Sequence, residues 1–561
     1  MKHWLGPALA APATLWLLLA FVAPFVVVVL LSVQAGSDPF VPLGLTPSFE
    51  QFASIFSDGY HLTIIAQTTL LALGVCLVTV LLGYPLALWV VSLAPRWRPL
   101  AIAMVLVPLL INVVVRSLGI ELLLAPDGLI NMVLSLVGLH ATHMLYNYGA
   151  IAVGLVQVFL PFMVLALYDV LQSTPPRVLE AARSLGASRT IRFFTVELPL
   201  SLPGLRAGLT FVFLMASTTY VSARMLGGKV AWVTGMLVWQ DVLENLDAQL
   251  ASAEALVMTL ISVAAAALIA LAMWRLTPWL SARPASAVSL PRWLCRTMDV
   301  VVPPLNILLL AVGLGLLLLP LGLVLVQSFN DVPQATMAGF RGFTLRWYQQ
   351  LFSSGLYLDS LWTSAELAVT TALFTVLLSV AAAFAIVRTK FPGKAALQAF
   401  WMFPISLPQV AIGIGMLRLL QQFTLLPAFL GLLAVHVTIT LPFCIGLLRA
   451  SVQQLDQAQE DAASSLGAGP LRRFFLVIVP GLAPGLAAAG IVAMLMSFEE
   501  VTITSLLTTA RMTTLPVRIY SEASYSLEPT VFCISTLMIA LTIAAMLVMG
   551  RLVRLDRVFS R

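Results

Sequence analysis

The sequence predicts an all-α, polytopic membrane protein of about 12 transmembrane helices, arranged as two pseudo-symmetric six-helix units. Three observations lead to this prediction. Apolar residues make up 60% of the 561 residues and charged residues only 10%, a composition that water-soluble domains do not show. Apolar stretches long enough to cross a bilayer core of about 30 Å recur along the whole chain. A set of motifs in the first half returns in the second half at a constant spacing.

Pro, Gly and charged residues divide the apolar sequence into twelve segments. Each holds the roughly 20 residues that a helix needs to cross a bilayer. The expected spans are 9–33, 62–93, 99–124, 149–172, 203–223, 249–274, 305–328, 358–387, 396–420, 427–448, 484–506 and 530–550. No small-residue cleavage site follows the first span, so it is expected to remain as a helix and not to be removed as a signal peptide.

Lys and Arg are distributed unevenly between the two alternating sets of loops. One set holds clusters such as Arg177, Arg183, Arg189 and Arg192, and the other set holds far fewer basic residues. Because basic loops stay in the cytoplasm, both termini are expected to be cytoplasmic. The basic residues are scattered among short loops and form no single stripe, which argues against a nucleic-acid partner.

The chain contains a tandem repeat. Its clearest part lies between the fourth and fifth span of each half. The matching residues are Glu180, Ala181, Gly186 and Pro199 in the first half and Asp461, Ala462, Gly467 and Pro480 in the second, since 461 − 180, 467 − 186 and 480 − 199 are all 281. Nearer the start of each half, Pro108 matches Pro404 with a spacing of 404 − 108 = 296. The first half therefore carries an extra segment, placed around 127–143.

The repeat suggests a division of the chain. Residues 1–280 form the first unit, residues 281–304 a Pro- and Arg-containing cytoplasmic linker, and residues 305–561 the second unit. Each unit has an even number of spans, so both units enter the membrane in the same sense. An axis along the membrane normal would relate them.

The doubled motif lies in two basic, cytoplasmic loops at about 175–202 and 450–483. Pro175 and Pro176 are suited to open a helix, and Gly186 is suited to end it. A second short helix is expected from Ser188 to Glu197, ending before Pro199. Such a helix pair would form a compact knob that docks in a groove of another protein.

Glu-Ala-Ala, a Gly six residues after the Glu and a Leu-Pro ending thirteen residues after that Gly resemble the signature of binding-protein-dependent ABC importer permeases. The resemblance covers nearly the whole chain. It implies two fused type I permease units in a bacterial inner membrane, two copies of a cytoplasmic ABC ATPase subunit and a periplasmic solute-binding protein. It also implies the residues that couple to the ATPase: Glu180, Ala181, Gly186, Pro199, Asp461, Ala462, Gly467 and Pro480.

Shorter strings resemble the spermidine/putrescine (polyamine) type of these permeases. They include Asn112-Val-Val-Val-Arg116, Leu345-Arg-Trp-Tyr348 and Ser497-Phe-Glu-Glu500. Iron, thiosulfate and phosphonate relatives share such strings. The resemblance therefore implies a small polar solute, first a polyamine or related organic cation. An anionic or zwitterionic solute, or iron(III), is the alternative, and a secondary transporter driven by an ion gradient is the rival mechanism.

The sequence lacks a phosphate-binding loop for ATP. Its Gly-Lys pairs, Gly228-Lys229 and Gly393-Lys394, precede Val and Ala and not the Ser or Thr that holds magnesium. The chain is therefore expected to be no enzyme and to bind no cofactor, with ATP and magnesium on the partner ATPase. His140 and His143 have no carboxylate nearby in sequence, so no metal site is expected.

Charged residues at membrane depth are costly and usually face a cavity. The candidates for the translocation path are Arg116, Thr219, Arg224, Glu366, Arg418, Glu499 and Glu500. Thr219 is included because the repeat places it opposite Glu500, where polyamine-type relatives often carry an acid. Arg224 adds positive potential near Thr219, which would suit an anionic solute. Arg116 could instead lock two helices through a carboxylate, and Glu366 and Arg418 could reach the membrane interface.

Overall fold

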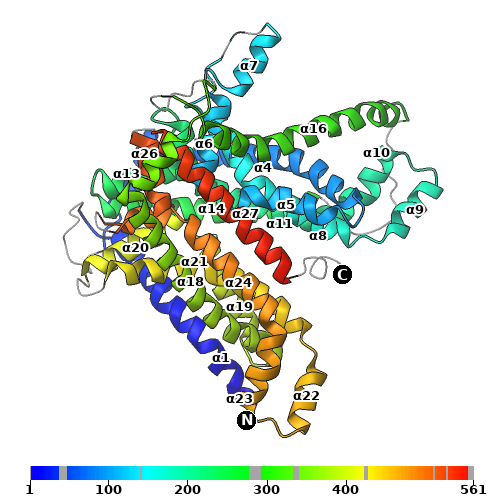
Figure 1. Ribbon diagram of the computed structural model, residues 1–561, viewed down its shortest axis with the longest axis vertical. Helices are drawn as coiled ribbons and strands as arrows, with labels where there is room; N and C mark the ends of the chain where they lie inside the picture. Colours follow the sequence, from blue (N-terminus) through cyan, green and yellow to red (C-terminus); the bar gives the residue numbers. More distant parts are fainter. Residues whose placement is uncertain are drawn as a thin grey trace. The chain divides into compact units, whose positions relative to one another are not determined.

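The computed structural model describes residues 2–36, 47–138, 140, 142–276, 292–332, 340–422, 427–509, 512–525 and 528–553. The described residues form helices joined by turns, with three isolated β-bridges. Figure 1 shows the helices with their labels. The predicted all-α fold is confirmed.

The helices of the first half are α1 (Lys2–Leu17), the π-helical turn η1 (Leu18–Val22), α2 (Ala23–Ser32), α3 (Glu50–Ser57), α4 (Gly59–Ser92), α5 (Arg98–Leu109), α6 (Val113–Leu124), α7 (Leu129–Leu136), α8 (Tyr148–Gln172), α9 (Pro176–Ser184), α10 (Arg189–Arg192), the π-helical turn η2 (Phe193–Glu197), α11 (Leu198–Ser217), α12 (Val221–Gly227), α13 (Thr234–Leu243) and α14 (Ala248–Leu276).

The helices of the second half are α16 (Arg292–Gln327), α17 (Arg346–Ser353), α18 (Gly355–Arg388), α19 (Lys394–Met402), the 3₁₀ turn η3 (Phe403–Ser406), α20 (Gln409–Gln422), α21 (Ala428–Gln454), α22 (Gln457–Ser465), α23 (Pro470–Arg473), the π-helical turn η4 (Phe474–Ile478), α24 (Val479–Glu499), α25 (Thr502–Leu507), α26 (Leu515–Tyr525) and α27 (Pro529–Val553).

Ten described helices are long and apolar enough to cross a membrane, and up to twelve spans result if each of two bent helix pairs counts as one. This agrees with the expected number. The spans 99–124 and 396–420 were each expected as one continuous helix. This was wrong, because the chain bends by 94° in the first and by 89° in the second. At the first bend the Asn112 side chain accepts the Val114 N–H at 2.8 Å and caps α6. At the second, Leu407 is extended because it precedes Pro408.

The expected spans 203–223 and 484–506 were placed too far along the chain. The corresponding apolar helices run over Arg189–Ser217 and Pro470–Glu499. The chain leaves helical geometry at Thr218 and Glu500, and the short helices α12 and α25 follow. Hydropathy alone does not separate a span from a short apolar helix directly after it.

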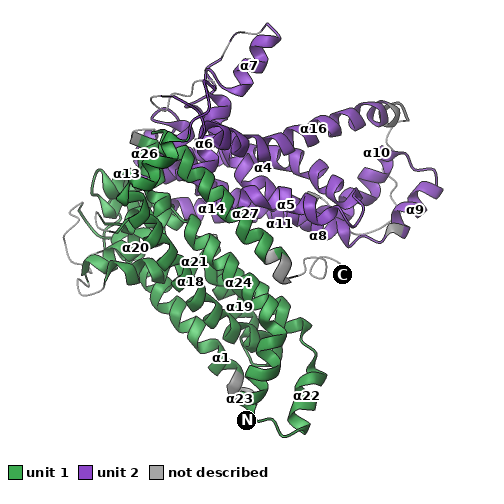
Figure 2. Cartoon of the chain, viewed as in Figure 1, with its two compact units in different colours: residues 1–54, 238–256, 345–561 green, residues 55–237, 257–344 purple. Residues whose placement is uncertain are grey.

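The chain forms two compact units, shown in Figure 2. Unit 1 comprises Met1–Ser54, Val238–Leu256 and Leu345–Arg561. Within it, α1 packs on α18 and α2 packs on α20. The indole Nε1 of buried Trp401 donates to Thr14 Oγ1 at 3.2 Å. Gly415 lies against Pro24, and a Cβ on Gly415 would lie 2.1 Å from the Pro24 carbonyl oxygen.

Unit 2 comprises Ile55–Leu237 and Val257–Thr344. Within it, α16 packs on α4 and α6. A Cβ on Gly119 would lie 2.4 Å from the Pro320 carbonyl oxygen, and a Cβ on Gly313 would lie 2.8 Å from Leu86. Glycine therefore permits the close approach of α16 to both helices.

The Gly415–Pro24 and Gly119–Pro320 contacts occupy equivalent positions of the repeat, since 415 − 119 and 320 − 24 are both 296. The first span of each repeat thus packs in the compact unit that holds most of the other repeat. The division into 1–280 and 305–561 follows the sequence repeat, whereas the compact units exchange these spans. Of the expected linker, residues 281–291 lie outside the described residues and 292–304 belong to α16.

Candidate functional site

The first doubled loop is a helix, a glycine turn and a second helix. α9 begins at Pro176, after Pro175, and ends at Ser184. Gly186 has a φ of +76°, a left-handed conformation that glycine adopts at little cost. Its N–H donates to the Arg183 carbonyl at 2.9 Å, and the Ala187 N–H donates to the Ala182 carbonyl at 3.1 Å. These bonds satisfy the last carbonyls of α9, as in a glycine C-cap.

The second doubled loop repeats this geometry. α22 ends at Ser465 and Gly467 has a φ of +80°. The Gly467 N–H donates to the Ser464 carbonyl at 3.0 Å, and the Ala468 N–H donates to the Ala463 carbonyl at 3.0 Å. The bounds of α9, α10 and η2 return in α22, α23 and η4 with the same spacing of 281, as 457 − 176 and 478 − 197 show.

The second helix of each loop does not end before its proline, so the expected end of the Ser188–Glu197 helix was wrong. α10, η2 and α11 form one continuous apolar helix, and so do α23, η4 and α24. Pro199 and Pro480 lie in the first turn of α11 and α24. A proline there removes an N–H, and the wider π turn just before it leaves room for the ring. Each loop therefore continues directly into a membrane span.

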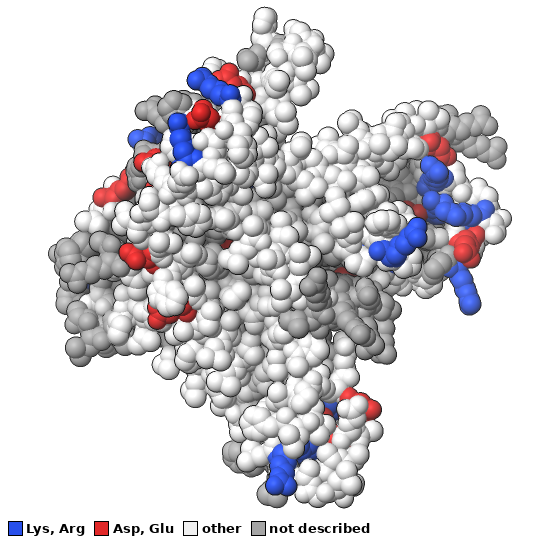
Figure 3. Space-filling view, in the orientation of Figure 1, with Lys and Arg blue, Asp and Glu red and all other residues white. Residues whose placement is uncertain are grey.

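The residues expected to couple to the ATPase lie on accessible parts of these loops. Glu180, Ala181 and Gly186 are exposed and Pro199 is half-buried. In the second copy, Asp461, Ala462, Gly467 and Pro480 are all exposed. In Figure 3, Lys and Arg gather over the part of unit 2 that carries α9 and α10, and over the part of unit 1 that carries α22 and α23.

Each loop also presents an exposed leucine, which sequence reasoning missed. Leu185 is 87% exposed and Leu466 is 89% exposed, and both directly precede the left-handed glycine. An apolar side chain held this far into solvent at the same place in both copies is typical of a contact surface. The signal was present in the sequence, because both loops read Ser-Leu-Gly-Ala at this point.

The two loops are anchored differently. In unit 2, the Thr190 N–H and hydroxyl donate to Asp299 on α16 at 2.9 and 2.8 Å, and Arg192 Nε donates to Glu197 at 2.8 Å. In unit 1, Arg388 at the end of α18 donates to Glu460 at 2.9 Å. The contacts of Asp299 and Arg388 each connect a loop to a long helix of its own unit.

Among the path candidates, Glu500 is part of a buried polar network in unit 1. Its carboxylate accepts the N–H groups of Ile503 and Thr504 at 2.9 and 2.8 Å, and the Thr504 hydroxyl as well. His436 on α21 lies 2.8 Å from Ser497 Oγ and 2.9 Å from Thr504 Oγ1, with its Nε2 4.0 Å from Glu500. Glu500 therefore caps α25 and joins three helical elements.

The first repeat lacks this network. With the spacing of 281, the positions of His436, Ser497, Glu500 and Thr504 correspond to Leu155, Ala216, Thr219 and Ala223. The other three members of the network are thus apolar in the first repeat. The exchange of Glu for Thr219 belongs to a concerted replacement, which single-residue comparison of the repeats did not reveal.

The other path candidates occupy different environments. Arg116 on α6 and Arg418 on α20 are buried, and Arg418 Nη1 donates to Gln421 at 3.4 Å. Thr219 lies in the non-helical link between α11 and α12, and Arg224 is half-buried on α12. Glu499, the last residue of α24, is half-buried, whereas Glu366 on α18 is exposed.

Two further buried acids of the described residues lie within expected spans and were missed. Glu121 lies on α6, five residues after Arg116, and the Tyr146 hydroxyl donates to it at 3.3 Å. Glu254 is buried on α14. Both lie within expected spans, so the same rule that selected Arg116 would have found them.

Comparison with known proteins identifies the family. The profile described as "Binding-protein-dependent transport system inner membrane component" matches residues 79–283 and again residues 375–556. These matches cover more than half of the chain and one copy falls in each sequence repeat. The chain belongs to this family.

Similar permeases come from spermidine/putrescine and putrescine transport systems of bacteria. The chain is 31% identical over 232 residues to the spermidine/putrescine transport system permease protein PotB of Haemophilus influenzae, covering 41% of this chain and 80% of that protein. It is 27% identical over 251 residues to the putrescine transport system permease protein PotI of Escherichia coli, covering 44% and 89%.

A solved structure of a bacterial alginate ABC transporter, bound to a pentasaccharide-loaded periplasmic protein, is 18% identical with a TM-score of 0.41. The match covers 50% of this chain and 96% of that chain. The PotB and PotI permeases each correspond to about half of this chain, as its tandem repeat requires. The resemblance drawn from the doubled motif is confirmed, and the protein is a fused, two-repeat membrane component of the family.

Proposed function

We propose that this permease is the transmembrane part of an ATP-driven importer that moves a polyamine or related organic cation from a periplasmic binding protein to the cytoplasm. The doubled loop carries the proposal. Both copies end a short helix on a left-handed glycine, expose a leucine and continue into a membrane span. A partner that moves the loops would therefore move the spans.

The partner is an ABC ATPase present in two copies, one for each loop. Glu180, Ala181, Gly186 and Pro199, with Asp461, Ala462, Gly467 and Pro480, form the coupling surface, and we add Leu185 and Leu466 to it. ATP and magnesium bind the ATPase, and this chain contributes no nucleotide site or cofactor. Rigid connection of loop and span is what alternating access between the two repeats requires.

Both termini and both loops face the cytoplasm of a bacterial cell in this proposal. The distribution of Lys and Arg supports it, because basic residues cluster in the loops on that side of the expected topology. The opposite side, which includes the segment 127–143, faces the binding protein.

The polyamine assignment is supported by the similarity to spermidine/putrescine and putrescine permeases and by the acids within the apolar helices. Arg116, Thr219, Arg224, Glu366, Arg418, Glu499 and Glu500 remain the proposed lining of the path, and Glu121 and Glu254 join them. An ammonium solute is attracted by such acids, whereas Arg224 and Arg418 would favour an anion.

The test is transport by the purified permease reconstituted in liposomes with its ATPase and binding protein. Uptake of radiolabelled putrescine or spermidine is expected with ATP and not with a non-hydrolysable analogue. Uptake driven by an ion gradient without ATP would contradict the proposed mechanism. ATP-dependent uptake of thiosulfate, aminophosphonate or iron(III) in place of polyamines would support the ATP-driven mechanism and contradict the proposed solute.

A further inference from the structure

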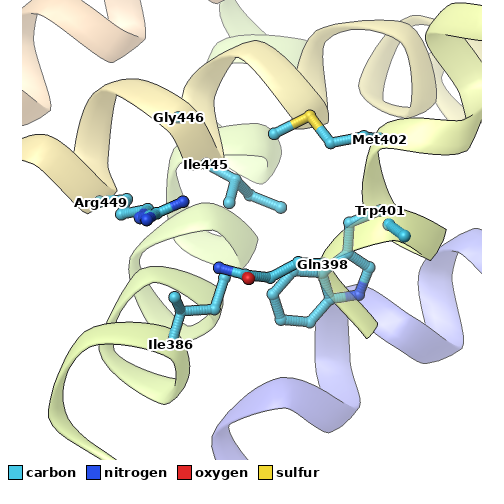
Figure 4. A pocket seen from close by; sticks show the side chains of 8 residues that line it. Ile386, Gln398, Trp401, Met402, Ile445, Gly446 and Arg449 are labelled. Carbon is cyan, nitrogen blue, oxygen red and sulfur yellow. The ribbon is translucent and has the colours of Figure 1, made fainter. Parts of the chain in front are cut away.

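Unit 1 contains an apolar pocket of about 220 Å³ between α18, α19 and α21. Figure 4 shows its walls. Ile386, Trp401 and Ile445 are buried and form the apolar lining, and Met402 at its edge is 41% exposed. A Cβ added to Gly446 would meet no atom within 4 Å, so the glycine leaves this side open.

Polar groups occur on one side of the pocket. Figure 4 shows the Gln398 amide and the Arg449 guanidinium extending toward the space between the three helices. Lys394 lies one turn before Gln398 on α19, on the same helix face. No Asp or Glu is among the described residues that line the pocket. The site therefore combines an apolar slot with a cationic entrance.

The first repeat lacks the residues that give this pocket its polar side and its open side. The spacings of 296 and 281 place Ile102 opposite Gln398, Leu165 opposite Gly446 and Tyr168 opposite Arg449. Ile102 and Tyr168 are buried. The cation and the amide of the second repeat are thus replaced by buried residues and the open glycine by a leucine, so the pocket is not a general consequence of the fold.

We propose that this pocket binds an anionic phospholipid of the cytoplasmic leaflet. Part of an acyl chain would lie against Trp401 and Ile445, and the phosphate would pair with Arg449 and accept from the Gln398 amide. The inference rests on the proposed orientation, in which the ends of α18 and α21 face the cytoplasm. Anionic lipid headgroups at that surface attract Lys and Arg, and an apolar slot beside the cation favours a lipid over a soluble anion.

The bound lipid would act next to a coupling loop. Arg449 lies on the last turns of α21, which ends at Gln454, and α22 begins at Gln457. Arg388, at the end of α18, donates to Glu460 of α22. Of the three helices that form the pocket, α21 therefore continues into the second loop and α18 contacts it through Arg388, so occupancy would favour one position of α22.

The experiment is native mass spectrometry of the purified full-length permease in detergent, titrated with phosphatidylglycerol or phosphatidylcholine of the same acyl chains. One phosphatidylglycerol is expected to bind in preference to phosphatidylcholine. Gly446→Leu, which copies the first repeat, should fill the slot and remove this lipid. Arg449→Gln should weaken the binding of phosphatidylglycerol about fivefold, which is the effect of removing one basic residue near an anionic surface. Arg275→Gln, at the exposed end of α14, is the matched charge control and should bind as the unaltered chain does.

Two results would overturn the proposal: equal phosphatidylglycerol binding by Gly446→Leu, Arg449→Gln and the unaltered chain, or displacement of the lipid by inorganic phosphate. Arg449 is exposed, so its variant is expected to fold even if Gly446→Leu does not. The measurement needs neither ATPase nor solute. Failure here would therefore leave the proposed transport function standing, and failure of transport would leave this site standing.

Discussion

The left-handed glycines of the two loops allow a prediction whose size follows from the backbone. Gly186 and Gly467 have φ values of +76° and +80°, and a Cβ on either would meet no atom within 4 Å. Alanine therefore causes no clash, and its cost is the left-handed backbone alone, about 1 to 2 kcal/mol per residue. This cost lowers the population of the loop conformation by about 5- to 30-fold relative to alternatives. Because the strain is local, the spans should insert and pack normally.

The assay is ATP hydrolysis by the reconstituted complex, stimulated by the solute-loaded binding protein. Gly186→Ala and Gly467→Ala should each reduce stimulated hydrolysis several-fold, and the double substitution should reduce it further. Asparagine adopts left-handed geometry more readily than alanine. Gly186→Asn should therefore retain more activity than Gly186→Ala. Gly74→Ala, at a helical glycine with equally open surroundings, is the control and should change nothing.

Full stimulated hydrolysis by the double alanine variant would refute the reasoning. Equal loss in the alanine and asparagine variants would also refute it, because the loss would then come from bulk and not from backbone conformation. Thermal unfolding of each variant in detergent separates either result from a general loss of folding.

Three other predictions concern packing and polar contacts. Gly415→Ala should lower the stability of unit 1 by about 1 to 3 kcal/mol, because its Cβ would lie 2.1 Å from the Pro24 carbonyl oxygen, whereas Gly322→Ala, which meets nothing, should be neutral in thermal unfolding. His436→Leu should cost about 1 to 3 kcal/mol by leaving the buried Ser497 hydroxyl without its partner, and an unchanged unfolding temperature would argue against the network. Asp299→Asn should speed hydrogen exchange of the Thr190 amide without affecting α22. Equal protection of this amide in the variant and the unaltered protein would contradict the proposed anchor.

The loops could be predicted closely from the sequence because their signals are local. Proline at the start of α9 and glycine just after it act through their own backbone, so they determine helix ends without reference to the rest of the chain. The repeat then transferred each assignment to the second copy. What local signals did not show is that the following helix continues through Pro199, because first-turn proline and a preceding π turn are compatible with a helix.

Long-range arrangement could not be read in the same way. Hydropathy shows that α1, α2 and α16 are apolar but not which apolar helix each one packs against, so their exchange between compact units was missed. The glycines at 119 and 415 that permit these contacts look like any other helical glycine in sequence. His436 and Ser497 are 61 residues apart, and only folding shows that His436, Ser497 and Thr504 form one polar network with Glu500.

The proposed function requires that both loops lie on the cytoplasmic side, where the ATPase subunits bind them. The most direct measurement is labelling of Leu185→Cys and Leu466→Cys, each in a chain lacking its native cysteines, with a membrane-impermeant maleimide. Both positions should react in inside-out vesicles and not in cells with only the outer membrane permeabilised, and added ATPase subunit should protect both. Labelling of either position from the outside of the inner membrane would contradict the account.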